Sequence, residues 1–238
     1  MMNRYKITFV LLFLFAILSC KDANAQKYTY QFSEKAEKNI SGDVVILPFG
    51  NSYPVKVGEL SGGKLTMDLE NVQSDVSRQI IDDHTTNIVE QTPFSCEDYD
   101  DSLPKSEVAL AGSFVVLAKD GLMIAELFAV TDKSLKDWFI SGGHESPVKS
   151  SFYEMMYSDF DVVIQDHCQN YSENGQKIIQ NHQMDLDLKK GFNRIEFRIE
   201  EVGKSENGDF DIPVKTMVTN KKMDWKNVKW VLNPIEGH

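Results

Sequence analysis

The chain has few cysteines and fewer basic than acidic residues, and its N-terminal apolar run is too short to span a membrane. Three cysteines among 238 residues exclude a scaffold built from many disulfide bonds. Lys and Arg number 25 against 36 Asp and Glu, and this acidity argues against nucleic acid, whose phosphates need a basic patch. The apolar run over residues 7–18 is shorter than the roughly 20 residues of a transmembrane helix. We therefore expect neither a nucleic-acid partner nor a permanent transmembrane helix.

Motifs of common catalytic sites are also missing. The sequence contains neither a glycine-rich phosphate loop nor a G-x-S-x-G or H-E-x-x-H motif. The single S-x-x-K match begins at Ser102, contains Pro104 and is a chance match. The histidines lie too far apart for metal-binding pairs, and we interpret them as surface residues. They are His84, His144, His167, His182 and His238. The sequence thus predicts a protein that is not an enzyme and holds neither metal nor cofactor.

The N-terminus has the pattern of an export signal. Arg4 and Lys6 precede the apolar run, and Cys20 follows it closely. A basic start followed by a short apolar stretch is typical of a signal peptide. We therefore expect an exported protein.

Two cleavage sites compete within this signal. Residues 17–20 resemble a bacterial lipobox, which predicts a signal peptide over residues 1–19 and an acyl chain on Cys20. Residues 23–25, Ala-Asn-Ala, fit the A-x-A rule, and cleavage after them would release a soluble secreted protein. We favour the lipobox because Cys20 lies directly at the end of the apolar run. The expected product is a lipoprotein that faces the periplasm or the cell surface and contacts the membrane through its lipid anchor alone.

Either cleavage leaves Cys96 and Cys168 as the unmodified thiols of the mature chain. Oxidising conditions outside the cytoplasm would allow these two to form a disulfide bond. Such a bond would restrain the unfolded chain by about 4 kcal/mol in the loop-entropy description. Each cysteine could instead be a small buried hydrophobic residue. The sequence leaves both interpretations open.

Alternation of apolar and polar residues with a period of two dominates the chain and predicts an all-β fold. Asp120-Gly121 between two apolar runs indicates a tight hairpin turn, since both residues tolerate positive φ. A helix is predicted over residues 74–83, where Ser74 can cap it. The expected strands lie at residues 28–32, 44–47, 55–60, 64–69, 112–118, 122–130, 152–157, 161–165, 176–188, 194–199, 212–218 and 228–232. This spacing favours an antiparallel β-sandwich with at most one or two short helices.

An acidic stretch over residues 97–104 ends in a proline, and we interpret it as a linker or exposed loop and as the candidate boundary between two β-rich halves. We predict an N-terminal β-rich domain at residues 20–103 and a C-terminal β-sandwich domain at residues 104–238. The stretch itself is expected to be an exposed loop. Asp-Ser-Leu within it resembles the short O-glycosylation site of Bacteroidetes proteins, which implies Ser102 as a modification site.

Two short motifs in the C-terminal half resemble one group of exported proteins. They are Tyr-Ser-Asp-Phe-Asp before an alternating strand at residues 157–164, and Leu-Asp-Leu-Lys-Lys-Gly-Phe-Asn at residues 186–193. Both are similar to motifs of uncharacterised exported β-sandwich lipoproteins of Bacteroidetes, which have Trp in place of Phe192. The resemblance implies a fold and a cell-envelope location, but no activity. In physical terms, Gly191 supplies a turn and Phe192 re-enters the core.

Trp138 and Trp225 are candidates for ligand stacking, since each lies beside charged residues. Core packing is the competing interpretation, because large aromatic residues dominate β-sandwich cores. The sequence predicts a non-catalytic lipoprotein that acts in binding, adhesion or assembly, with a protein or glycan ligand that it does not identify. The alternative is a secreted hydrolase or an accessory carbohydrate-binding module. A compact pocket with two carboxylates of shifted pKa would favour the alternative, whereas a broad exposed apolar or aromatic patch would favour binding.

Overall fold

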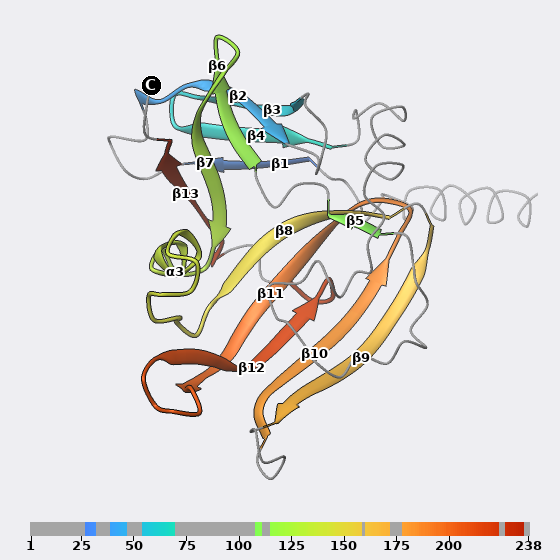
Figure 1. Ribbon diagram of the computed structural model, residues 1–238. Helices are drawn as coiled ribbons and strands as arrows, with labels where there is room; N and C mark the ends of the chain where they lie inside the picture. The colour runs from blue at the N-terminus through green and yellow to red at the C-terminus, as the bar shows by residue number, and fades with distance from the viewer. Residues whose placement is uncertain are drawn as a thin grey trace, which may run out of the picture.

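The computed structural model describes residues 27–31, 39–46, 54–69, 108–110, 115–158, 160–171, 178–223 and 227–235 (Figure 1). Within these ranges the regular elements are β-strands, apart from one short helix, α3 (Leu135–Ile140). The predicted all-β fold with two β-rich halves is therefore confirmed. The predicted helix at residues 74–83 and the acidic stretch at residues 97–104 lie outside the described residues.

The described strands form one continuous and mostly antiparallel sheet. Its N-terminal half runs in the order β1, β4, β3, β2, β6 and β7, and β13 also pairs with β7 (Figure 1). These strands are β1 (Lys27–Gln31), β2 (Gly42–Ile46), β3 (Val55–Ser61), β4 (Lys64–Asp68), β6 (Val115–Lys119), β7 (Leu122–Val130) and β13 (Lys229–Pro234).

The C-terminal half continues from β7 in the order β8, β11, β12, β10 and β9, with the short β5 also on β8. Its strands are β5 (Val108–Leu110), β8 (Ser151–Ser158), β9 (Val162–Tyr171), β10 (Ile178–Leu188), β11 (Gly191–Lys204) and β12 (Asp211–Thr219). Among the described pairs, only β10 and β12 run parallel. The two halves join where Ala129 and Val130 of β7 pair with Tyr153 and Phe152 of β8.

Two hydrophobic cores share the strands at this junction. Successive side chains of a strand point to opposite faces, so Tyr153 of β8 joins the first core while Phe152 joins the second. Strand β13 divides in the same way, with Trp230 in the first core and Val231 in the second. Both faces of these strands are therefore buried where they pass between the two cores.

The first core is built from both ends of the chain. The predicted domain boundary between residues 103 and 104 lies outside the described residues, and the core takes side chains from segments on both sides of it. Leu60 and Leu65 precede that position, whereas Leu127 and Trp230 follow it. The N-terminal half of the sheet therefore needs β6, β7 and β13 in order to bury its apolar face.

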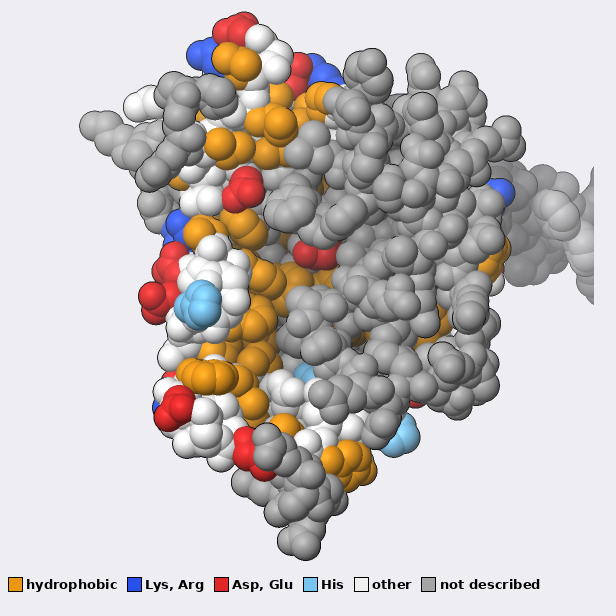
Figure 2. All heavy atoms as spheres, viewed as in Figure 1, with side chains coloured by type: hydrophobic (Ala, Val, Ile, Leu, Met, Phe, Trp, Pro, Cys, Tyr) orange, Lys and Arg blue, Asp and Glu red, His pale blue; other side chains and the backbone are white. Residues whose placement is uncertain are grey.

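The hairpin between β6 and β7 has the turn that its sequence favours. Asp120 and Gly121 both have positive φ, 53° and 80°, as a tight hairpin turn requires. The hairpin projects from the top of the molecule, and its tip carries hydrophobic side chains beside charged ones (Figure 2). Leu122 and Met123 are the exposed hydrophobic residues there.

The corner between β10 and β11 is a second predicted turn, and it has a structural role. Gly191 has a φ of 101°, which permits the reversal, and Phe192 then enters the first core. The Asn193 side-chain oxygen accepts a hydrogen bond from the backbone N–H of Lys189. Its amide donates to the backbone carbonyls of Lys189 and Gly191. Asn193 thus makes hydrogen bonds with three backbone groups of the turn and stabilises it.

Aromatic rings organise the second core. Phe152 and Phe197 stack with their ring centroids 4.6 Å apart, and Phe139 of α3 meets Phe152 edge-on at 4.3 Å. Such pairs contribute roughly 0.5–1.5 kcal/mol beyond the burial of their area. The helix is therefore held on the sheet by ring packing.

We expect Phe197→Ala to lower the free energy of unfolding by about 3–5 kcal/mol, because it opens a cavity in this stack. Phe197 is fully buried, whereas Phe210 is 56% exposed and provides a matched control. Phe210→Ala should change the free energy by no more than about 0.5 kcal/mol. Urea denaturation followed by circular dichroism measures both, and equal losses would contradict the assignment of Phe197 to the core.

Candidate functional site

Trp138, a predicted stacking residue, packs within the fold. It lies on α3, half-buried against the second core, with its ring centroid 5.0 Å from that of Phe139. The ring thus packs against the core while part of it is accessible, and ligand stacking at Trp138 stays a prediction. Trp225 and Ser102 lie outside the described residues, so stacking at Trp225 and glycosylation at Ser102 stay predictions.

Cys168 is buried on β9 and takes part in a disulfide bond. The other two cysteines of the chain, Cys20 and Cys96, lie outside the described residues. The pairing of Cys168 with Cys96 therefore stays a prediction, as does the lipid modification of Cys20.

The prediction that all histidines lie at the surface is wrong for His182. This residue is 7% exposed on β10, and its Nδ1 is 2.7 Å from the Thr216 hydroxyl on β12. Burial lowers the pKa of His182 to about 4, because the imidazolium loses its hydration. His144 and His167 are exposed, as predicted. Within the described ranges, no three His, Cys, Asp or Glu side chains are grouped so that they could hold a metal ion.

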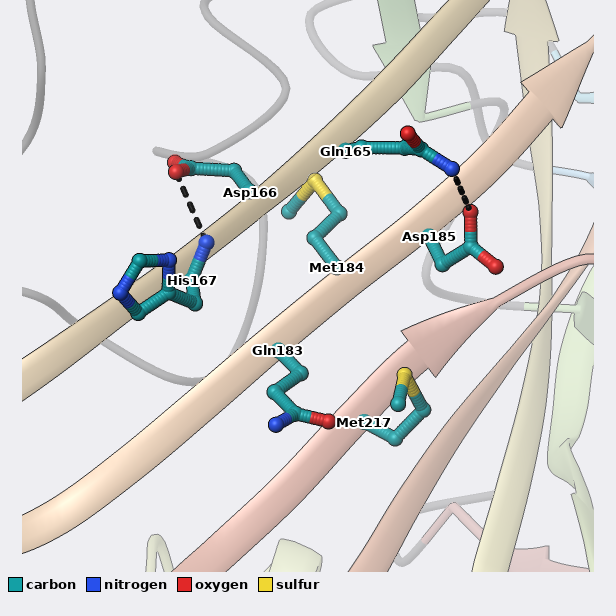
Figure 3. Close-up of a pocket in the computed structure, with 7 residues that line it drawn as sticks. All are labelled: Gln165, Asp166, His167, Gln183, Met184, Asp185 and Met217. Atoms are coloured by element: carbon teal, nitrogen blue, oxygen red, sulfur yellow. Dashed lines mark hydrogen bonds between the residues drawn. The ribbon is translucent and has the colours of Figure 1, made fainter.

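The candidate functional site is an open depression on the C-terminal half, and Figure 3 shows the side chains that line it. Gln165, Gln183 and Met217 alternate with residues of the second core, so the depression lies mainly on the outer face, the face away from that core. It has a volume of about 410 Å³ and opens to solvent. Three neighbouring strands, β9, β10 and β12, supply its lining. The lining residues are Gln165, Asp166, His167, Gln183, Met184, Asp185 and Met217.

Strand register brings the central lining residues together. Met217 of β12 lies beside Gln183 of β10, which lies beside His167 of β9, so the three form a row across the sheet. In the next row Gln165 donates a hydrogen bond from Nε2 to Oδ1 of Asp185, at 3.1 Å. The surface thus combines amide, imidazole and carboxylate groups with the thioether of Met217, and can offer both hydrogen bonds and apolar contact, whereas the side chain of Met184 belongs to the second core.

Asp185 is held in its ionised form. Lys221 donates a short hydrogen bond to its Oδ1, and this contact, together with the one from Gln165, lowers the pKa of Asp185. A carboxylate held in this way accepts hydrogen bonds but is a poor proton donor near neutral pH. Asp185 therefore contributes a hydrogen-bond acceptor and a negative charge to the depression.

A charged row on β11 borders the depression. Glu196 is 3% exposed and accepts hydrogen bonds from the Ser151 hydroxyl at 2.6 Å and from Arg198 Nε at 3.0 Å. The hydrogen bond with Glu196 is the main cause that raises the pKa of Arg198. Because its partners compensate its charge, Glu196 can remain buried. Arg198 lies beside Met217 in register, so the outer face continues from the depression to this row.

Glu154 lies on the opposite, inner face of the sheet. Strand β8 places it between Phe152 and Met156, which both belong to the second core, and beside Ile195 of β11. Desolvation there raises the pKa of Glu154 from 4.5 to about 7. Because Glu154 faces the core, its carboxyl is separated from the outer depression by the sheet.

Sequence reasoning did not identify the lining of the depression. The signal that it offers is the alternation on β9, where Gln165 and His167 are exposed while Ile164 and Cys168 are buried. This pattern predicts a polar face but not its neighbours. The parallel pairing of β10 with β12, which brings Met217 beside Gln183, is a long-range contact.

Comparisons with protein-family models, with curated proteins and with solved structures find no match for this chain. The structural description therefore rests on the fold and the site themselves: an all-β protein with an open, polar depression on its sheet. In the part of the chain that the structure describes, no helix has both the length and the hydrophobicity to cross a membrane.

Glu154 and His182 give stability opposite dependences on pH. The pKa of Glu154 in the folded state, about 7, lies above its ordinary value of 4.5. The contribution of Glu154 to the free energy of unfolding is therefore complete below pH 4.5 and is lost as the pH rises to 7. The pKa of His182, about 4, lies below its ordinary 6.5, so its contribution is complete above pH 6.5 and lost as the pH falls to 4. Between pH 4.5 and 6.5 the loss of stability from Glu154 and the gain from His182 with rising pH largely cancel.

We therefore expect the two single variants to have slopes of opposite sign. The free energy of unfolding of Glu154→Gln should rise between pH 4.5 and 6.5, and that of His182→Gln should fall, each by about 1 kcal/mol per pH unit. Urea denaturation at pH 4.5, 5.5 and 6.5 measures both slopes. Parallel profiles for the two variants would show that these groups are not the ones that titrate.

Proposed function

We propose that this chain is a non-catalytic cell-envelope lipoprotein that binds a protein or glycan ligand on the outer face of its C-terminal half. The observation that carries the proposal is the open depression on β9, β10 and β12. Amide and carboxylate side chains there can bind the hydroxyl groups of a glycan or the backbone of a peptide, and Met217 adds apolar contact.

The character of the acidic groups favours binding over hydrolysis. Hydrolysis of a glycoside needs one carboxyl of raised pKa and a second carboxylate across the same cleft. The depression contains Asp166 and Asp185, and the pKa of Asp185 is lowered. Glu154, whose pKa is raised, lies on the other face of the sheet. The acidic groups therefore support a surface that recognises a ligand without transforming it.

The predicted export signal supports the cell-envelope location in this proposal. The basic start, the short apolar run and Cys20 together favour a lipid anchor on the mature chain. A single acyl chain gives only marginal membrane binding, so stable anchoring requires more than one chain on the same cysteine. The described sheet would then stand outside the membrane with its outer face accessible to a ligand.

Intact-protein mass spectrometry of the membrane fraction from the native host tests the anchor. We expect a mature N-terminus at Cys20 that carries acyl mass, and we expect Cys20→Ala to shift the protein out of the membrane fraction. An unmodified chain that begins at Gln26 would contradict the lipoprotein and favour the soluble secreted form.

Site-specific photo-crosslinking in the native host tests the binding surface. A photoreactive phenylalanine analogue at Gln183, in the depression, should give a discrete higher-mass adduct. The same analogue at Lys119, which is exposed near the tip of the β6–β7 hairpin, is the matched control and should give none. Adducts of equal yield at both positions, or at Lys119 alone, would contradict a ligand at the depression.

A further inference from the structure

Basic side chains beside the depression contact carboxylates in three described pairs. The pairs are Lys221 with Asp185, Arg198 with Glu196 and Lys215 with Glu200. In the last two pairs the facing nitrogen and oxygen atoms are 2.9 Å apart. An anionic ligand would have to displace one of these carboxylates from its basic partner. The pairs therefore favour a ligand without negative charge.

The centre of the depression offers uncharged hydrogen-bonding groups. Gln183 of β10 lies in register between His167 of β9 and Met217 of β12, and Figure 3 shows it without a hydrogen bond to the other residues drawn. Gln165 uses its amide nitrogen to bind Asp185, and its carbonyl oxygen takes no part in that bond. An amide group both donates and accepts hydrogen bonds, as a hydroxyl group does. The centre is therefore matched to a ligand with many uncharged hydroxyl groups.

Strand β9 extends this polar surface to an exposed aromatic ring. Gln169 and Tyr171 continue the outer face beyond His167, and the ring of Tyr171 is accessible. The Tyr171 hydroxyl donates a hydrogen bond to Oε1 of Gln169 at 2.8 Å, which holds the ring on this side of the strand. From Gln165 to Tyr171 the strand covers roughly 20 Å. Several linked sugar rings fit along such a length, and the face of an aromatic ring can pack against the C–H groups of one of them.

The distribution of apolar groups favours a glycan over a protein. Protein interfaces concentrate large apolar and aromatic anchors at their centre. Here the centre consists of amide and imidazole groups around Met217. The exposed hydrophobic residues of β9, Val163 and Tyr171, lie instead near its two ends.

We propose that the ligand of the depression is a neutral polysaccharide whose chain lies along β9. One sugar ring stacks on Tyr171, beside the amide of Gln169. Hydroxyl groups of the following rings bind the amides of Gln183 and Gln165, and Met217 contacts an apolar face of the chain. The inference rests on the proposed function, because it names the class of ligand for the same surface.

Photo-crosslinking from Met217 in the native host tests the ligand class. A photoreactive phenylalanine analogue at this position lies in the depression and leaves its amides in place. We expect an adduct that releases neutral monosaccharides on acid hydrolysis. Uronic acids, or sugars that carry phosphate or sulfate, would overturn the assignment of a neutral chain.

The other outcomes separate this inference from the proposed function. A second polypeptide in the Met217 adduct would overturn the polysaccharide and leave the ligand surface in place. The absence of an adduct at Met217 would also overturn the polysaccharide, and the result at Gln183 then decides whether the proposed surface fails with it.

Substitutions added to the Met217 photo-crosslinking chain test the path along β9. Tyr171→Ala removes the stacking ring and Gln183→Ala removes an amide, so each should lower the adduct yield about fivefold. Tyr171→Phe keeps the ring and should keep the yield. Phe210→Ala is the matched control and should leave the yield unchanged, because Phe210 is also an exposed aromatic residue but lies about 23 Å from Met217 along the chain.

An undiminished yield in Tyr171→Ala, or equal losses in Tyr171→Ala and Phe210→Ala, would contradict the proposed path. Thermal melting of the purified variants shows whether each remains folded. We expect unchanged melting temperatures for both Tyr171 variants, because the side chain of Tyr171 is exposed.

Discussion

The alternation of side chains along β8 is the constraint on which both cores depend. Because successive residues face opposite sides, Tyr153 and Met155 pack into the first core while Phe152 and Met156 pack into the second. A shift of one residue in its pairing would exchange all four and would bury the wrong set in each core. The register of β8 against β11 therefore fixes how the two halves of the sheet meet.

This double burial also determines where charge can lie. Glu196, close to the junction on the outer face, stays buried because Ser151 and Arg198 satisfy its carboxylate. Glu154 faces the second core, no hydrogen bond to its carboxyl is seen among the described residues, and desolvation raises its pKa. The two carboxyls differ because one has hydrogen-bond donors on its face of the sheet and the other has apolar neighbours.

The outer face becomes open and polar with distance from the junction. Strands β10, β12 and β9 expose amides, carboxylates and an imidazole on this side, while their other side is buried in the second core. The buried disulfide at Cys168 tethers β9 from the inner face and leaves the outer side chains exposed.

The sequence by itself determined the local structure. Alternation predicted the strands, Asp120-Gly121 and Gly191 predicted turns, and their positive φ angles agree with this, because such preferences depend on neighbouring residues alone. It did not predict the buried position of His182, the return of β13 to β7 or the parallel pairing that places Met217 beside Gln183. Those features join segments far apart in the chain, and any strand of suitable alternation satisfies the local rules equally well. Only the tertiary structure decided which strands became neighbours, because that choice depends on how the two cores are filled together.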